Sequence, residues 1–162
     1  MAWEGFLNLM SASRPLTNAV ELLRAAHLRP TRQRLALVRV LFDQGNRHVT
    51  AEQLHGEVVE AAVPVSLATV YNTLHQFVEA GLLREVVVNS SRSYFDSNVT
   101  DHHHFLFEDT GRLLDIPGEL VDVSGPEPPA GAAIRRIDVL IRVERDPAPA
   151  VRRRRGPGSA QG

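Results

Sequence analysis

SLATVYNTLHQFVEAG, residues 66–81, contains the pattern from which the architecture follows. Ser66 is a good helix N-cap, and Gly81 is typical of the position just after a helix end. The apolar residues between them recur at spacings of three and four: Val70, Leu74 and Phe77. This spacing predicts a helix with one buried face. Tyr71 lies about 100° from Val70 around the helix axis, so we expect its ring at the surface rather than in the core.

Three shorter helices are expected before this one. Thr17 is the predicted N-cap of the first, and Thr31, directly after Pro30, is the predicted N-cap of the second. The third begins at Thr50, where Gln53 stands three residues later and completes a capping-box pattern. Each helix has apolar residues at helical spacing, which indicates a small bundle around a shared core.

Short runs of β-type residues follow the helices. Residues 83–88 and 93–95 are separated by a turn-forming segment, which predicts a hairpin. Helices followed by a two-stranded hairpin are typical of a winged helix-turn-helix. Beyond Val99 we expect strands at residues 102–107, 112–116 and 134–143. The predicted fold class is α+β: an N-terminal winged helix-turn-helix and a small C-terminal α/β dimerisation domain.

The expected domain organisation has four parts. They are a flexible N-terminus at 1–16, a winged-helix DNA-binding domain at 17–98, a metal- or haem-sensing dimerisation domain at 99–146 and a disordered basic tail at 147–162. The sheet of the third part is too small to bury itself. It needs a second copy of the chain or the first domain as a partner, which favours a homodimer.

Composition excludes several kinds of site. The chain of 162 residues has no cysteine, so disulfides, thiolate zinc sites and thiol nucleophiles are excluded. No apolar run approaches the ~20 residues of a membrane span, and we expect a cytoplasmic protein without a membrane partner. All 18 basic residues are arginine, and six of them lie between Arg24 and His48 against one acid. This cluster is either a phosphate-facing surface or an ordinary solvated helix face.

Three adjacent histidines mark the second candidate site. In an extended strand, His102 and His104 point to one face and His103 to the other. Two imidazoles with carboxylates nearby suit Fe, Mn or Zn, or an axial position on haem. The alternative is a solvated, tag-like histidine tract, which seldom occurs in mid-chain before an apolar run.

Two motifs resemble the ferric uptake regulator family. They are LRPTRQR at residues 28–34 and SLATVYNTL at residues 66–74, and the resemblance extends from about 17 to 146. Within that family, YNTLHQF at 71–77, the triple histidine and PEPP at 126–129 resemble the iron response regulator branch. The resemblance implies a homodimeric bacterial transcriptional regulator, mainly a repressor, of iron or haem homeostasis genes that responds to metal or haem.

The same resemblance implies a set of DNA-contacting residues. Helix 66–80 would enter the major groove with Tyr71 against thymine methyl groups, while arginines contact phosphates. The candidate DNA-binding residues are Arg29, Thr31, Arg32, Arg34, Ser66, Thr69, Tyr71, Asn72 and Thr73. The expected partner is double-stranded DNA.

It also implies a regulatory metal site that joins the two domains. The expected ligands are His48, Asp96, His102, His104 and Asp115. The usual family histidine aligns with Phe105, so His102 or His104 would replace it. The expected cofactor is Fe, Mn or Zn. Haem is a second candidate at His102, His103 and His104, because the Cys-Pro haem motif of some relatives is absent here.

Two other functions remain open from the sequence. One is a sister regulator that responds to peroxide, manganese or zinc. The other is a metal-dependent enzyme with a zinc ion held by His102, His104 and a carboxylate. No obvious general base accompanies the histidines and there is no HExxH motif, so we expect a regulator and not an enzyme.

Overall fold

The computed structural model describes residues 18–145. The expectations for 1–16, for Thr17 and for 147–162 concern residues outside this range. The described residues divide into two compact units, the first ending at Thr100 and the second beginning at Asp101. Within 18–145, no helix has the length and apolar character that crossing a membrane requires.

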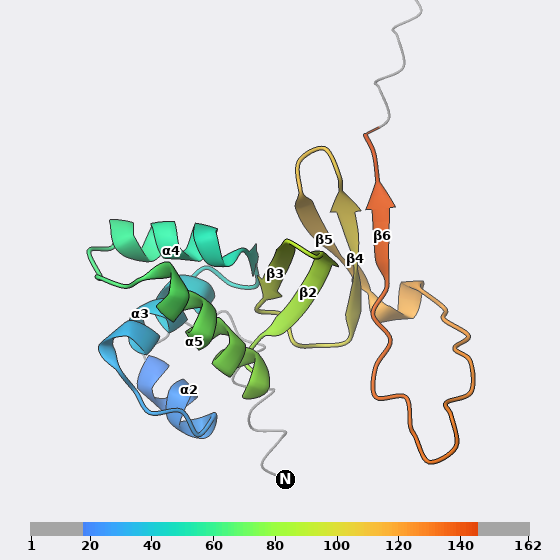
Figure 1. Cartoon of the computed structure of the whole chain (residues 1–162), viewed down its shortest axis with the longest axis horizontal. Helices are drawn as coiled ribbons and strands as arrows, with labels where there is room; N and C mark the ends of the chain where they lie inside the picture. The colour runs from blue at the N-terminus through green and yellow to red at the C-terminus, as the bar shows by residue number, and fades with distance from the viewer. Residues whose placement is uncertain (1–17, 146–162) are drawn as a thin grey trace, which may run out of the picture. The chain divides into compact units, whose positions relative to one another are not determined.

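Among residues 18–100, the first unit contains four helices (Figure 1). They are α2 (Ala19–Ala25), α3 (Arg32–Phe42), α4 (Ala51–Glu60) and α5 (Leu67–Glu79). The side chain of Thr31 accepts from the Arg34 amide, and that of Ser66 accepts from the Thr69 amide. Thr50 and Gln53 form both bonds of the capping box. These three predicted N-caps are correct, whereas the N-cap position of α2 is Asn18.

The core of the first unit lies between the helices. The predicted apolar face of α5 is completely buried, and Phe77 is its largest side chain. Other fully buried residues are Leu23 from α2, Leu37, Val38 and Leu41 from α3, and Leu54 and Val58 from α4. One continuous cluster therefore holds the helices together, and α5 contributes to its centre.

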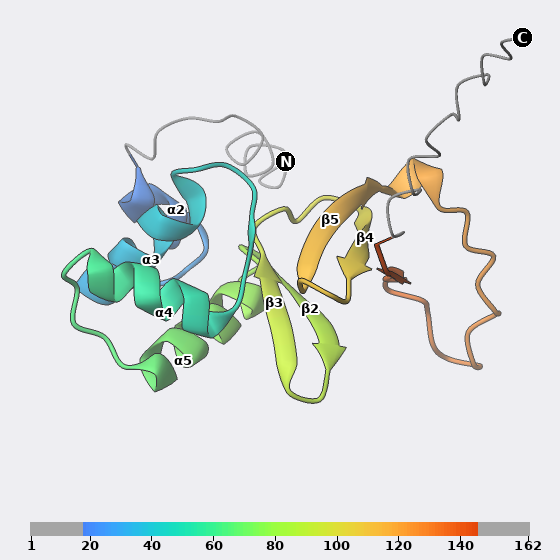
Figure 2. The ribbon, with the colours of Figure 1, turned by 90° about the horizontal axis from the view of Figure 1, so that it is seen from above.

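The hairpin after α5, formed by β2 (Arg84–Asn89) and β3 (Arg92–Asp96), is seen in Figure 2. It belongs to a three-stranded sheet, because β3 also pairs antiparallel with β1 (His48–Val49). Gly81 adopts a positive φ of 74° where α5 ends, a conformation that glycine accepts without a steric penalty. The sequence predicted only the two long strands, because a two-residue strand shows no alternation.

The second unit contains a mixed sheet in the order β5-β4-β6. Strand β4 (His102–Phe107) pairs antiparallel with β5 (Arg112–Pro117) and parallel with β6 (Leu140–Val143). A short 3-10 turn, η1 (Gly118–Leu120), follows β5.

The predicted strand at 134–143 is wrong over its first six residues. The Val139 amide donates to Nδ1 of His103 at 3.3 Å instead of to a backbone carbonyl. The Val139 carbonyl accepts from the His104 amide at 3.1 Å, and regular pairing with β4 starts at Leu140. Ile134 is 48% exposed, so the apolar alternation that predicted the strand has no covering layer there.

Candidate metal and nucleic-acid binding sites

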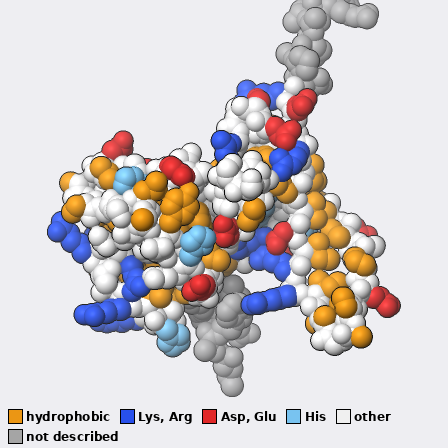
Figure 3. All heavy atoms as spheres, in the orientation of Figure 1, with side chains coloured by type: hydrophobic (Ala, Val, Ile, Leu, Met, Phe, Trp, Pro, Cys, Tyr) orange, Lys and Arg blue, Asp and Glu red, His pale blue; other side chains and the backbone are white. Residues whose placement is uncertain are grey.

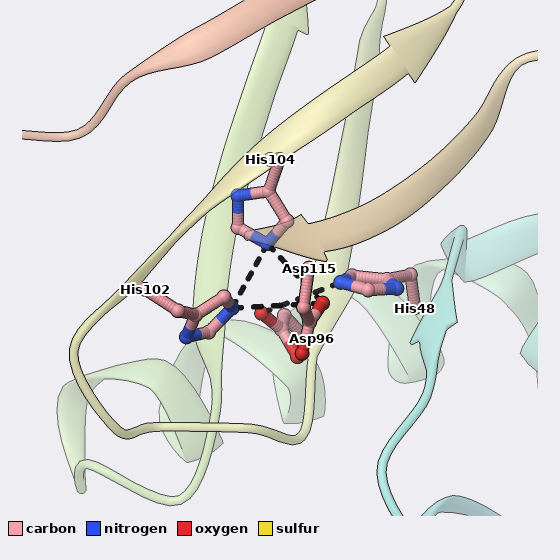
Figure 4. Close-up of side chains that lie close together, drawn as sticks. All are labelled: His48, Asp96, His102, His104 and Asp115. Carbon is pink, nitrogen blue, oxygen red and sulfur yellow. Dashed lines mark hydrogen bonds and ion pairs between the residues drawn. The ribbon is translucent and has the colours of Figure 1, made fainter. Parts of the chain in front are cut away.

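The first group of candidate ligands, here called the wing pair, is His48 and Asp96. The two residues face each other in the β1–β3 register. His48 Nε2 lies 3.5 Å from Asp96 Oδ2, and the Asp96 side chain is fully buried (Figure 4). Arg84 of β2 is the register partner on the other side of Asp96 and is also buried. A buried carboxylate next to an imidazole is suited to bind a cation.

The second group, here called the sheet triad, is His102, His104 and Asp115. His102 Nε2 and His104 Nε2 lie 3.0 Å apart on one face of β4. Asp115 Oδ1 of β5 lies 3.8 Å from the first of these nitrogens and 3.9 Å from the second. Figure 4 shows the three side chains of this unit pointing toward one another. Both imidazoles are buried.

The middle histidine lies on the opposite face of the strand. His103 is buried, and its Nδ1 accepts from the Val139 amide. It therefore connects β4 to the start of β6 and takes no part in the sheet triad. The alternation predicted for the three histidines is the one that the structure has.

The donor chemistry of the sheet triad fits a borderline transition-metal ion. Two imidazoles and one carboxylate, with positions left open, are the ligands of many non-haem Fe(II) sites. With metal–nitrogen bonds of about 2.1 Å, the 3.0 Å between the two nitrogens corresponds to an angle of about 90° at the ion. Neighbouring ligands of an octahedron make this angle, so both imidazoles can bind one ion side by side.

The candidate DNA-binding residues divide into two groups. Arg29, Arg32, Tyr71 and Asn72 are exposed, and basic side chains project from the first unit in Figure 3. Ser66 and Thr31 are exposed N-caps, and the Ser66 and Thr69 hydroxyls lie 2.9 Å apart. A helix N-terminus with short polar side chains is suited to contact phosphate.

Two members of the predicted DNA-binding set form side-chain hydrogen bonds within the protein. Thr73 is buried, and its hydroxyl donates to the Thr69 carbonyl at 2.8 Å. The guanidinium of Arg34 donates to the Gln76 side chain and to the Arg29 carbonyl. Thr73 therefore retains little surface from which to reach DNA, and Arg34 links α3 to α5. Burial of Thr73 speaks against its expected DNA contact, because this residue lies on the buried side of the helix, next to Leu74.

Tyr71 lies at the surface, and its hydroxyl is bound. The ring is 36% exposed. Its hydroxyl donates to Oε1 of Glu52, on α4, at 2.7 Å. This hydrogen bond lowers the pKa of the Glu52 carboxyl below 4.5, with help from the backbone amide of Glu52 itself. The same hydrogen bond, more than burial, raises the pKa of the Tyr71 hydroxyl above 10.0.

Sequence reasoning missed Glu52 and Arg84. Glu52 stands in the first turn of α4, where acids are common because they favour the helix dipole; nothing local indicated a contact with a tyrosine 19 residues away. Arg84 is the second residue of the predicted strand 83–88, and its place opposite Asp96 appears only in the register of the structure. The Glu52–Tyr71 contact depends on how α4 packs against α5, and the Arg84–Asp96 pairing depends on the register of β2 and β3.

A helical unit with a β wing has the form of a winged helix-turn-helix, and it is followed by a sheet on which two histidines and an aspartate converge. The model of the ferric uptake regulator family matches residues 25–138. The chain belongs to the ferric uptake regulator family, whose members are DNA-binding regulators, are dimers and are not enzymes.

Individual relatives are similar to it over most of their length. The peroxide-responsive repressor PerR of Staphylococcus aureus strain Mu50 is 31% identical over 110 residues, which are 68% of this chain and 74% of that protein. PerR of Staphylococcus epidermidis is 33% identical over 108 residues, 67% of this chain and 71% of the relative. The ferric uptake regulator of Pseudomonas aeruginosa with manganese superposes with a TM-score of 0.61 at 25% identity, covering 80% of this chain and 98% of that one.

Proposed function

We propose that this protein is a bacterial, homodimeric DNA-binding repressor whose affinity for DNA depends on Fe(II), Mn(II) or Zn(II) held by histidine and aspartate. The observation that supports this best is the sheet triad. Its two imidazole nitrogens converge at 3.0 Å with a carboxylate beside them. A DNA-binding regulator acts in the cytoplasm, which is the location that we propose.

The first unit supplies the DNA-binding surface in this proposal. Helix α5 enters the major groove, and Tyr71 and Asn72 reach base edges from its exposed side. Arg29 and Arg32 contact the phosphates beside the groove. Phe77 and its neighbours pack the opposite face of the same helix into the core. This packing holds in position the helix that carries Tyr71 and Asn72.

The metal would act by connecting the two units. The wing pair offers two ligands and the sheet triad offers three, and neither number completes the six positions that octahedral ions prefer. We propose that one ion takes ligands from both groups. Binding would then favour one relative arrangement of DNA-reading and dimerising units, which shifts the population toward it.

Dimerisation is assigned to the second unit. This part of the chain exposes several apolar side chains: Leu120, Val123, Ile134 and Ile141. Figure 3 shows apolar side chains along β6 and the segment that leads to it. Its three-stranded sheet has little core of its own, and a second copy of the chain would cover this surface.

Iron is the signal that we propose, on the basis of the 2-His-1-carboxylate set and the resemblance to the iron response regulator branch. The geometry favours an iron ion over haem. The two axial ligands of a haem iron stand on opposite sides of the macrocycle, whereas His102 Nε2 and His104 Nε2 lie 3.0 Å apart and are buried. His103, the third haem candidate, is hydrogen-bonded to the Val139 amide.

Peroxide is the second candidate signal. Two of the similar proteins are peroxide-responsive repressors. Iron(II) with open coordination positions supplies redox reactivity when bound. In a peroxide sensor, hydrogen peroxide added to the Fe(II)-loaded protein would transfer one oxygen atom to a ligand histidine and leave the other as water, so the protein would gain the mass of one oxygen atom. Mass spectrometry of the tryptic peptide 93–112, which contains His102 and His104, measures this; no added mass with Fe(II) rejects this signal.

A DNA-binding assay tests the proposed function. Duplexes are enriched from a random library by the purified protein, and binding is then measured metal-free and with Mn(II), Zn(II), Fe(II) or haem at one salt concentration. A metal ion is expected to change the dissociation constant for the enriched duplex by at least about fivefold, a typical coupling between two sites. Absence of DNA binding in every state would overturn the proposal, and a response to haem alone would reinstate the haem reading.

Replacing Tyr71 and Arg32 should have different effects on DNA binding. Tyr71→Ala is expected to weaken binding of the enriched duplex by ~1–3 kcal/mol while changing binding of random duplex little. Arg32→Ala is expected to weaken both duplexes alike and to reduce the slope of log affinity against log salt by about one. Fluorescence anisotropy at several salt concentrations measures both quantities. Equal losses on random DNA from the two changes contradict these roles.

A further inference from the structure

The exposed carboxylate of Glu52 lies on the proposed DNA-binding surface, where a negative charge is unfavourable. It lies 2.7 Å from the Tyr71 hydroxyl, so any duplex that contacts the Tyr71 ring passes close to this negative charge. Phosphate and carboxylate repel each other. If this surface binds DNA, as proposed above, an acid at this position would weaken binding to DNA in general.

Geometry indicates a role for this acid. A tyrosine side chain on a helix surface can change rotamer about two bonds. In Tyr71, by contrast, contacts restrain both the hydroxyl and the ring. The hydroxyl donates to Glu52, and the ring stacks on His75 one turn later, with centroids 6.5 Å apart and planes at 21°. His75 in turn contacts Phe95 of the wing edge to face, with centroids 5.6 Å apart.

Glu52 is itself held in position. It lies in the first turn of α4, between Thr50 and Gln53 of the capping box. The hydrogen bond from Tyr71 lowers the pKa of the Glu52 carboxyl, so the group carries its negative charge at neutral pH.

We propose that Glu52 is a positioning residue for DNA-sequence discrimination: it holds the Tyr71 ring in the orientation that contacts thymine methyl groups and repels DNA that does not provide this contact. The inference rests on the proposed function. Preorganisation reduces the ordering cost of binding. The charge lowers affinity for sequences that cannot use the ring, and both effects increase the ratio of specific to random binding.

The test compares four variants on three DNA probes, all with Mn(II) and at one salt concentration. The probes are the duplex enriched by the wild-type protein, the same duplex with uracil in place of single thymines, and a random duplex of equal length. The variants are Glu52→Ala, Glu52→Gln, Tyr71→Phe and the double variant Tyr71→Phe/Glu52→Ala. Glu60→Ala, an exposed acid in the last turn of the same helix, is the matched control.

Glu52→Ala is expected to lower the ratio of specific to random affinity by about three- to tenfold, the effect of one hydrogen bond, and to reduce the penalty for uracil. Tyr71→Phe leaves the charge in place, so it should lower the ratio less than Glu52→Ala does, and the double variant should match Glu52→Ala. Glu52→Gln keeps an acceptor for the Tyr71 hydroxyl but removes the charge, so it should lower the ratio less than Glu52→Ala does, through increased affinity for random DNA. Glu60→Ala should leave the ratio unchanged.

Two results would overturn the inference. One is an unchanged ratio in Glu52→Ala; the other is independent, additive losses from the two changes in the double variant, because residues that act through one contact are not additive. Failure of the proposed function looks different, since the wild-type protein would then enrich no duplex from the library.

Discussion

Replacing both His102 and His104 by alanine is expected to abolish the stabilisation of the protein by Mn(II) or Zn(II). An ion that binds only the folded state stabilises it by about 2.7 kcal/mol at a concentration 100 times its dissociation constant. The double variant lacks two of the three ligands of the sheet triad. Its metal affinity should fall by more than the roughly 10–100-fold that loss of an outer-shell partner causes. Thermal unfolding with and without metal, together with calorimetric titration, measures both effects.

His103→Asn is the matched control for this prediction. It changes a histidine of the same strand whose side chain lies on the opposite face, and the asparagine oxygen can accept from the Val139 amide in place of Nδ1. The variant should bind metal as the wild type does. Wild-type metal affinity in the double variant, or loss of metal binding only in His103→Asn, would contradict the assignment of the sheet triad.

Phe77→Ala is expected to lower the free energy of unfolding of the first unit by ~3–5 kcal/mol. Phe77 has no exposed surface and is the largest buried side chain on α5, so alanine would leave a cavity that close-packed neighbours fill only in part. Urea unfolding followed by circular dichroism measures the change. DNA binding should weaken as well, because α5 loses the support that holds its exposed face.

Val59→Ala is the control for the core prediction. This valine lies on α4 in the same unit and is 49% exposed, so removal of its methyl groups should change stability by no more than about 0.5 kcal/mol. A loss below about 1 kcal/mol in Phe77→Ala, with the helices intact, is inconsistent with the core described here.

Local patterns predicted the helices and their beginnings. Thr31, Thr50 and Ser66 are N-caps because their side chains reach amides only three residues away, and such contacts follow directly from neighbouring sequence. The buried face of α5 and the exposure of Tyr71 follow in the same way from 3.6-residue periodicity. The period of two likewise predicted that His102 and His104 share a face.

The predictions of strands were wrong where the strand was too short to show a pattern, or where the pattern had no neighbouring strand to pair with. Strand β1 has two residues and is identified only by its pairing with β3. Residues 134–139 alternate as a strand does but lack regular backbone pairing with β4. Thr73 was expected to contact DNA because the family resemblance implied it, whereas its position on the helix turns it toward the core.

Sequence by itself determined the helical bundle with its wing, the absence of thiolate chemistry and the presence of an imidazole pair on one strand face. Tertiary structure alone decided that His48 lies opposite Asp96, that Asp115 lies beside His104, and that Glu52 binds the Tyr71 hydroxyl. The physical reason is the range of the interactions. Caps and periodicity act over three or four residues, whereas strand register and helix packing are set by the burial of the whole chain.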